Sequence, residues 1–178
     1  MHRRHSLLLP SVWLMTDERM GAALLPSIAA LPRGSGLVFR HYQSPDRKDM
    51  YNRVKRLAKA RRLVLILAGP ERLARSWQAD GSHSRSSLKP TRIRTAPVHS
   101  IPERIAAERA GADLLFVSPV FATQSHAGAR PLGRVRFARL ISGAKCPVIA
   151  LGGLSKRRFR SLQALGLYGW AAIEGLMR

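Results

Sequence analysis

A histidine and a hydroxyl group stand together where a predicted strand leads into a predicted helix. Residues 94–98 read Arg-Thr-Ala-Pro-Val, which favours a short strand, and His99 and Ser100 follow them directly. Ser100 is a favourable N-cap, Pro102 suits an early helical position, and Glu103 has the spacing of a capping box. An imidazole titrates near neutral pH, so His99 can take a proton from one atom of a substrate and return it to another. We therefore predict proton transfer by His99, with a structural role in the turn that starts the helix as the alternative interpretation.

The next predicted strand indicates where a substrate would meet His99. After a helix that ends at Gly111, residues 114–117 read Leu-Leu-Phe-Val, a continuous apolar run typical of a strand buried in a parallel sheet. Strand, helix and strand within about thirty residues form a βαβ unit. Chemistry in such folds lies at the carboxyl ends of the strands, which here means His99 and residues 118–123.

Two other predicted strand ends carry groups that can bind phosphate. Arg40 follows the predicted strand 36–39, and its guanidinium can form paired hydrogen bonds with phosphate oxygens. Gly152 and Gly153 follow the predicted strand 147–151. Such a turn can present backbone N–H groups to a phosphate, and it can equally serve a backbone that needs positive φ.

A polar loop adds further candidates. Thr123 and Ser125 offer hydroxyl groups, and His126 with Gly128 fits a loop that closes over a ligand. An ordinary polar loop has the same composition, so both interpretations remain open. Asp17, after the first predicted strand, is expected to form an ion pair with a neighbouring arginine.

Eight strand candidates recur along the chain and would position these side chains. Their ranges are 12–15, 36–39, 63–67, 79–83, 94–98, 114–117, 147–151 and 168–173. Predicted helices alternate with them, except in the polar stretch 84–91, which has little room for more than a turn of helix. This alternation predicts a (β/α)8 barrel in one domain spanning residues 1–178, with an open doubly wound sheet as the competing architecture.

The predicted barrel is small. About 250 residues is usual for this fold, so a chain of 178 residues requires shortened helices. The sequence stops soon after the eighth predicted strand, so we expect the eighth helix to be missing or only a turn long. The apolar flank left there would be covered by residues 7–9 or by a second subunit in a homodimer.

The charge of the chain is strongly positive. Its 31 Lys plus Arg and 10 Asp plus Glu give a formal net charge of +21, and only six of the basic residues are lysine. Such a field attracts phosphates, whether on nucleic acids or on small metabolites, although scattered arginines also fit a general bias in composition. Only 6% of the residues are aromatic, and we expect Trp13, Phe39, Phe116 and Trp170 to be buried. Nucleic acid is therefore the least favoured partner.

Cysteine usage and hydropathy indicate the compartment. The single cysteine, Cys146, excludes an intrachain disulfide and precedes an apolar strand, so we predict a buried bystander. No apolar run reaches the roughly 18 residues of a membrane span. The basic and apolar start superficially mimics a signal peptide, but no small-residue cleavage site follows, and residues 12–15 serve better as a strand. We predict a cytoplasmic protein with no membrane partner.

Several stretches, taken in order, resemble the thiamine phosphate synthase and thiazole tautomerase family. They are Trp-Leu-Met-Thr-Asp at 13–17, Phe-Arg at 39–40, Ala-Asp-Gly-Ser-His at 79–83, Val-His-Ser at 98–100, Gly-Ala-Asp at 111–113, Pro-Val-Phe-Ala-Thr at 119–123, Pro-Leu-Gly at 131–133 and Pro-Val-Ile-Ala-Leu-Gly-Gly at 147–153. The ordered likeness runs over nearly the whole chain. It implies a (β/α)8 barrel, which agrees with the strand count.

The resemblance implies an enzyme of thiamine biosynthesis that acts on a phosphorylated thiazole. The tautomerase branch places a histidine where His99 stands, so metal-independent proton transfer by His99 is the favoured function. The residues expected to bind substrate and phosphate are Arg40, Thr123, Ser125, His126, Gly152, Gly153, Glu174 and Gly175. Glu174 replaces a serine of the family, and a carboxylate beside a phosphate must turn away or act as a proton acceptor.

The synthase branch is the alternative, and it joins a pyrimidine diphosphate to a thiazole phosphate with magnesium. The family's Asn-Asp pair after the third strand falls on Ala68 and Gly69, and its second metal-binding Asp falls near residues 86–88, where no carboxylate stands. Magnesium requires hard oxygen ligands. We therefore expect no metal site and no cofactor. A synthase would need a rearranged magnesium site, in which Asp17 or Asp80 holds the metal together with the diphosphate.

Other positions also depart from the family pattern. Tyr42 stands where a basic residue follows the family's arginine, and His126 stands where the family has a lysine. His41 and His83 have no third ligand at metal spacing, so no zinc site is predicted. A third hypothesis is a barrel without catalysis that binds phosphorylated ligands or nucleic acid. The partners predicted are a phosphorylated thiazole, a pyrimidine diphosphate in the case of a synthase, and a second copy of the chain.

Overall fold

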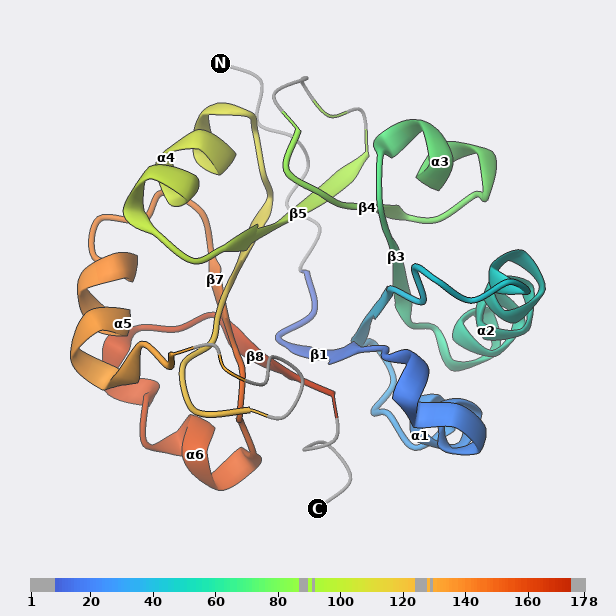
Figure 1. Cartoon of the computed structure of the whole chain (residues 1–178), viewed down its shortest axis with the longest axis horizontal. Helices are drawn as coiled ribbons and strands as arrows, with labels where there is room; N and C mark the ends of the chain where they lie inside the picture. Colours follow the sequence, from blue (N-terminus) through green and yellow to red (C-terminus); the bar gives the residue numbers. More distant parts are fainter. Residues whose placement is uncertain (1–8, 87–89, 91, 124–127, 129, 174–178) are drawn as a thin grey trace.

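The computed structural model describes residues 9–86, 90, 92–123, 128 and 130–173. Eight parallel strands form a closed barrel in the order of the sequence (Figure 1). They are β1 (Val12–Met15), β2 (Gly36–Phe39), β3 (Val64–Ala68), β4 (Gly81–His83), β5 (Ile93–Val98), β6 (Leu114–Val117), β7 (Val148–Leu151) and β8 (Gly169–Ala172). The predicted (β/α)8 barrel is confirmed. An open sheet is excluded because β8 pairs with β1, placing Trp13 opposite Ala171.

Helices surround the barrel in most of the connections between strands (Figure 1). They are η1 (Glu18–Ala23), α1 (Leu24–Ala29), α2 (Arg47–Arg61), α3 (Glu71–Ser76), α4 (Ile101–Arg109), α5 (Gly133–Ile141), α6 (Lys156–Arg160) and η3 (Gln163–Leu165). Only α2 reaches 15 residues, whereas α1 and α3 have six and α6 has five. The shortened helices predicted from the chain length are therefore confirmed.

One connection has no helix in its described part. Between β4 and β5, residues 84–86, 90 and 92 are not helical, as the polar composition of this stretch predicted. The described residues of this connection lie between α3 and α4 (Figure 1). After β8 the structure describes only Ile173, so the prediction that the eighth helix is missing or only a turn long concerns residues outside the described ones.

The barrel interior is filled by apolar side chains that alternate along the strands with residues facing the helices. The interior cluster consists of Trp13, Met15, Val38, Ile66, Ala68, Leu114, Phe116, Ile149 and Ala171. The Trp13 ring packs edge-on against Phe116 with 5.4 Å between ring centroids. Gly36 makes room for this indole, because a Cβ at that position would lie 2.1 Å from Trp13 Cε3. All four aromatic residues predicted to be buried are buried.

Two outer clusters fix the helices to the barrel. One includes Phe39 and Tyr51 and packs β1–β3 against α1–α3, and the other includes Phe137 and Trp170 and packs β5–β8 against α4–α6. In the second cluster Phe159 of α6 stacks on Trp170, 5.9 Å between centroids. The helices thus form two groups, and the described residues of the connection between β4 and β5, which are not helical, lie between α3 and α4.

The amino-terminal end of the barrel is closed by the segment before β1. Trp13 Nε1 donates to Pro10 O at 2.5 Å, and the Tyr168 hydroxyl donates to Leu9 O. Of residues 7–9, which were predicted to cover the flank of the eighth helix, only Leu9 is described. For Leu9 the prediction is wrong, because its side chain packs against the interior cluster and its carbonyl is held by Tyr168.

Cys146 is a free, half-buried thiol whose Sγ donates to Ala112 O. Burial raises its pKa to about 11, so the thiol is un-ionised at neutral pH, as expected of a bystander. No helix in the described part of the chain has both the length and the apolar composition to cross a membrane.

Candidate functional site

The carboxyl ends of the strands open at one end of the barrel, which we call the mouth. Arg40 directly follows β2, His99 follows β5, and Gly152 follows β7. Since all eight strands are parallel, these residues lie around the mouth, as predicted. Thr123 is half-buried in the loop after β6. Four other predicted binding residues lie outside the described residues, and their roles remain predictions: Ser125, His126, Glu174 and Gly175.

Arg40 is held in an ion pair at the ends of β1 and β2. Its Nη2 lies 2.9 Å from Asp17 Oδ2, and its Nε donates to Thr16 O at 2.6 Å. Arg19 Nε lies 2.7 Å from Asp17 Oδ1. The side-chain hydrogen bond from Arg19 is the main reason that the pKa of Asp17 is lowered, whereas burial lowers the pKa of Arg40. The expected pairing of Asp17 with an arginine is therefore confirmed.

Two histidines near the mouth are packed as structural groups. His41 stacks on Phe39 and hydrogen-bonds Thr16 Oγ1 at 3.0 Å, and burial lowers its pKa. His83 lies inside the barrel, with Nδ1 2.8 Å from Thr95 Oγ1, and burial lowers its pKa to about 3. Both rings are therefore neutral at pH 7. No group of three metal-ligating side chains occurs in the described part of the chain, and the absence of a zinc site stays a prediction.

His99 is exposed and shares one ring nitrogen between two partners. Its Nδ1 lies 2.7 Å from Arg85 Nη2 and 3.0 Å from Glu103 Oε2. An arginine only donates and a carboxylate only accepts. Nδ1 therefore accepts from Arg85 when it carries no proton and donates to Glu103 when it carries one. His99 has a partner in both protonation states, as a group that transfers protons requires.

The helix start predicted after β5 explains this arrangement. Ser100 Oγ accepts from Glu103 N at 3.3 Å, as in a capping box. The reciprocal bond differs from the usual one, because Glu103 Oε2 accepts from His99 N at 2.7 Å rather than from the N-cap residue itself. Burial favours a higher pKa for Glu103, but the hydrogen bonds from His99 outweigh it, so the net pKa is lowered. The cap thus places an ionised carboxylate against the imidazole.

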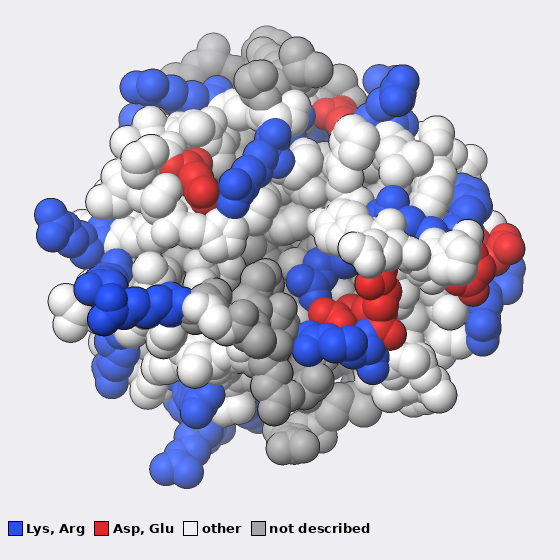
Figure 2. Space-filling view, viewed as in Figure 1, with Lys and Arg blue, Asp and Glu red and all other residues white. Residues whose placement is uncertain are grey.

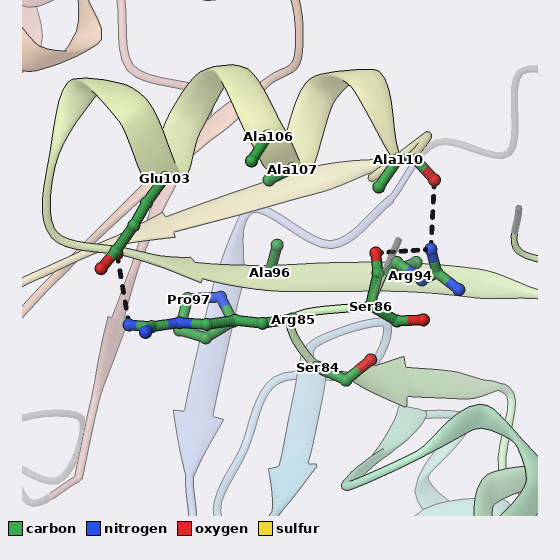
Figure 3. A pocket seen from close by; sticks show the side chains of 10 residues that line it. All are labelled: Ser84, Arg85, Ser86, Arg94, Ala96, Pro97, Glu103, Ala106, Ala107 and Ala110. Atoms are coloured by element: carbon green, nitrogen blue, oxygen red, sulfur yellow. Dashed lines mark hydrogen bonds and ion pairs between the residues drawn. The ribbon is translucent and has the colours of Figure 1, made fainter. Parts of the chain in front are cut away.

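A cavity of about 200 Å³ adjoins this cluster on the outer side of β5 (Figure 3). Alanines of α4 point toward β5 on one side, and the loop 84–86 forms the other side. Arg85 and Glu103 meet at one end, and Arg94 lies at the other (Figure 3). Arg94 is fully buried, donates to Ala110 O at 3.1 Å and lies 3.2 Å from Glu71. It ties α3 to α4 beside the connection between β4 and β5, whose described residues form no helix.

The glycine pair after β7 is required by close packing. Gly152 has φ +98° and Gly153 has φ +61°. A Cβ on Gly152 would lie 2.7 Å from Pro119 Cα, and a Cβ on Gly153 would lie 2.3 Å from Ala122 O. The turn therefore needs glycine for its backbone and for contact with the loop after β6. Phosphate binding by its N–H groups remains a prediction.

The comparisons with known proteins agree with this fold. A family model described as thiamine monophosphate synthase matches residues 15–176. The chain belongs to this family. The thiamine-phosphate synthase of Syntrophomonas wolfei is 30% identical over 94% of this chain and 88% of its own length. The putative thiamine-phosphate synthase 2 of Aquifex aeolicus is 27% identical over 93% of this chain and 97% of its own length.

A solved structure supports the same fold. Thiamine phosphate pyrophosphorylase from Pyrococcus furiosus matches 95% of this chain and 87% of its own, with a TM-score of 0.77 and 24% identity. The resemblance drawn from the sequence motifs to the thiamine monophosphate synthase family is thus confirmed.

The residues at the end of β3 do not fit the magnesium that the family resemblance implies. Ala68 is buried and apolar, and Gly69 has φ +137°, a conformation that strains any residue bearing a carboxylate. In the loop after β4, Ser84, Arg85 and Ser86 supply no carboxylate. Both carboxylate oxygens of Asp17 form ion pairs, one with Arg19 and the other with Arg40.

The suggestion that Asp80 holds the metal is wrong. Asp80 precedes β4 and therefore lies at the end of the barrel opposite to the mouth. Its Oδ2 accepts from Leu65 N at 2.8 Å, near the start of β3. In a parallel barrel, a residue before a strand cannot reach the ends of the strands.

Sequence reasoning missed two arginines of this thiamine monophosphate synthase family member. Arg85 contacts His99, and Arg47 reaches the ends of β2 and β3. Nothing in the sequence distinguishes Arg85 from the many other arginines as a residue of the site. For Arg47 a weak signal exists, because a cation in the first turn of a helix opposes the helix dipole and suggests another reason for its place.

The surface charge is dispersed. On the face shown in Figure 2, Lys and Arg side chains form separate groups, some beside Asp or Glu, rather than one continuous basic stripe. A nucleic-acid groove requires basic residues that follow a backbone, with aromatic residues between them. This face therefore gives no support to the nucleic-acid hypothesis.

Proposed function

We propose that the protein is a thiamine-phosphate synthase that joins a pyrimidine diphosphate to a phosphorylated thiazole at the mouth. The observation that carries the proposal is the pair of arginines at the ends of β2 and β3, in a barrel whose relatives are named synthases. Arg40 Nη2 and Arg47 Nη2 are both fixed by contacts with the protein. Fixed guanidinium groups at a barrel mouth suit a substrate that carries a diphosphate.

The reaction needs stabilisation of a leaving group more than it needs a proton carrier. The bond between the pyrimidine-bearing carbon and the diphosphate oxygen breaks, and its electron pair leaves with the diphosphate. A lone pair on the thiazole ring forms the new bond to that carbon, and no proton has to move. Cations that meet the developing charge on the diphosphate lower the barrier. The thiazole phosphate would bind across the mouth, at Thr123, Gly152 and Gly153.

The test is formation of thiamine phosphate from the two purified substrates, followed by chromatography. We expect turnover by the wild type and a loss of about 10²–10³-fold in kcat for Arg40→Met, in the range measured for removal of one charge-stabilising donor. Arg134→Met is the matched control, because Arg134 is an exposed residue of α5, and this variant should retain wild-type turnover. Absence of product from the wild type, with and without magnesium, would contradict the proposal.

A second candidate function is a 1,3-proton shift in a phosphorylated thiazole, and the paired contacts of His99 favour it. Nδ1 has a donor in Arg85 and an acceptor in Glu103. Such a ring can return at one carbon the proton that it takes from another. The measurement is isomerisation and deuterium incorporation by NMR in D₂O. A wild-type rate equal to the uncatalysed rate would remove this candidate and leave the synthase proposal untouched.

A further inference from the structure

Arg47 places a guanidinium between the carboxyl ends of two neighbouring strands. It is the first residue of α2. Its Nη2 donates to Ala68 O at 2.8 Å and to Arg40 O at 3.0 Å, and its Nε donates to Arg40 O at 3.2 Å. These carbonyls lie at the ends of β3 and β2. The charge of a helix residue is thereby carried to the rim of the mouth.

Aromatic rings hold this guanidinium in place. Arg47 Cζ lies 5.3 Å from the centroid of Trp77, which follows α3, and 5.5 Å from the centroid of Tyr42. Both contacts are in the range of cation–π attraction. With three backbone hydrogen bonds, they fix the orientation of the group before any ligand arrives, which lowers the entropic cost of binding.

The charge of Arg47 is not cancelled by the described part of the protein. Among the described residues, no carboxylate forms an ion pair with Arg47, whereas Arg40 and Arg19 share Asp17. No described residue accepts a hydrogen bond from Arg47 Nη1. The side chain is half-buried rather than enclosed, so this nitrogen has two N–H groups available for an anion.

The place of Arg47 coincides with the place from which the expected magnesium ligands are missing. Ala68, whose carbonyl accepts from Arg47, is one of the two residues on which the metal-binding pair would fall. Its neighbour Gly69 has a backbone that disfavours a carboxylate residue. Tyr42, where a basic residue was expected, instead contributes its ring to Arg47. The positive charge at the end of β3 is therefore that of the Arg47 guanidinium rather than that of a bound metal ion.

We propose that Arg47 binds the diphosphate of the substrate at the ends of β2 and β3, in place of a divalent metal. The ligand class is a diphosphate ester, or inorganic pyrophosphate as the product. Arg47 Nη1 donates to its oxygens, and Arg40 lies on the neighbouring strand end. This inference rests on the proposed function and adds to it that diphosphate recognition needs no magnesium.

The experiment is titration calorimetry with inorganic pyrophosphate in EDTA. Wild type is compared with Arg47→Met, which keeps the apolar stem and removes the charge. Arg56→Met is the matched control, because Arg56 is exposed on the same helix and its loss lowers the net charge equally. We expect Arg47→Met to bind pyrophosphate about 10–100-fold more weakly, as for hydrogen bonds to a charged group, and Arg56→Met to bind like wild type.

Two results would overturn the inference. One is equal affinity in Arg47→Met and Arg56→Met, and the other is wild-type binding that appears only when magnesium is added. If circular dichroism shows that Arg47→Met is unfolded, Arg47→Lys is the second variant, because it keeps the charge but loses the planar fork. We expect roughly tenfold weaker binding by Arg47→Lys, and wild-type affinity would contradict direct contact through the fork.

The readout separates this inference from the proposed function. Pyrophosphate bound through Arg47 by a protein that forms no thiamine phosphate would remove the synthase proposal and leave the inference standing. Synthase turnover by the wild type, combined with unchanged pyrophosphate affinity in Arg47→Met, would support the synthase proposal and contradict the inference about Arg47.

Discussion

The two sides of the barrel mouth use the same residue types for different chemistry. At the ends of β1–β3, the arginine side, Arg40 pairs with Asp17 and Arg47 binds backbone carbonyls. At the ends of β4 and β5, the histidine side, Arg85 and Glu103 meet on the ring of His99. Each side combines arginine with a carboxylate, yet on the histidine side both groups contact an exposed imidazole.

The difference follows from what the guanidinium groups contact. Carbonyl oxygens do not change their charge, so Arg47 has a fixed position and a constant charge. His99 Nδ1 can accept a hydrogen bond from Arg85 or donate one to Glu103, so these two residues are alternative partners of the ring. The arginine side is therefore suited to holding an anion, and the histidine side is suited to moving a proton. Variants on the arginine side should therefore change anion binding, and variants on the histidine side should change proton transfer.

The largest expected effect is on proton transfer. His99→Gln keeps the size and hydrogen bonding of the side chain but cannot titrate, so we expect the rate of the thiazole proton shift to fall about 10²–10⁴-fold. Pyrophosphate affinity, measured by calorimetry, should remain that of wild type. Arg47→Met is the reciprocal variant, with weaker pyrophosphate binding and an unchanged proton shift. Loss of both properties in either variant would show that the two sides form one site.

The next effect concerns acid stability and originates in the barrel interior rather than at the mouth. His83 is neutral when folded, with a pKa of about 3, but binds a proton near pH 6.5 when unfolded. Its contribution to stability is complete above pH 6.5 and is lost as the pH falls toward 3. Between pH 6.5 and 4.5, the free energy of unfolding should fall by about 2–3 kcal/mol more for wild type than for His83→Gln. Urea titrations that give parallel pH curves for both proteins would contradict this assignment.

A smaller effect is expected from the ion pair of the arginine side. Asp17→Asn removes the partner of the largely buried Arg40 and should lower the free energy of unfolding by about 1–3 kcal/mol at pH 7. Because the pKa of Asp17 is lowered on folding, its contribution is complete above about pH 4 and is lost below it. The stabilities of wild type and Asp17→Asn, measured by urea unfolding, should therefore converge in acid. A constant difference down to pH 2 would be inconsistent with an ionic role for Asp17.

The smallest effect is expected from the carboxylate of the histidine side. Glu103→Gln should lower the free energy of unfolding by only about 0.5–1 kcal/mol, since Glu103 and its partners are partly exposed. Its loss should instead shift the pH–rate profile of the proton shift, because protonated His99 loses a charged acceptor. A destabilisation larger than that of Asp17→Asn would show that the histidine side is the more rigid of the two.

Much of the barrel was predictable because its signals are local. Continuous apolar runs such as 114–117 are typical of strands buried in a parallel sheet. Ser100 and Glu103, three residues apart, have the spacing of a capping box and so predict the start of a helix. Arg40, His99 and Gly152 could be assigned to one mouth because parallel strands end on the same side. The same rule, applied to Asp80, would have excluded it from the mouth, since it lies near the start of the predicted strand 79–83 and precedes β4 in the structure.

The sequence by itself determined the order of the strands, the motifs that match the family and the absence of carboxylates at Ala68 and Gly69. Only the tertiary structure decided that Arg47 occupies the end of β3, that Arg85 reaches His99, and that Leu9 closes the bottom of the barrel. The neighbours of a long side chain in the sequence do not determine which groups it contacts in the folded protein. It is placed by carbonyls and rings that distant segments bring within reach, and those distances exist only after the barrel has closed.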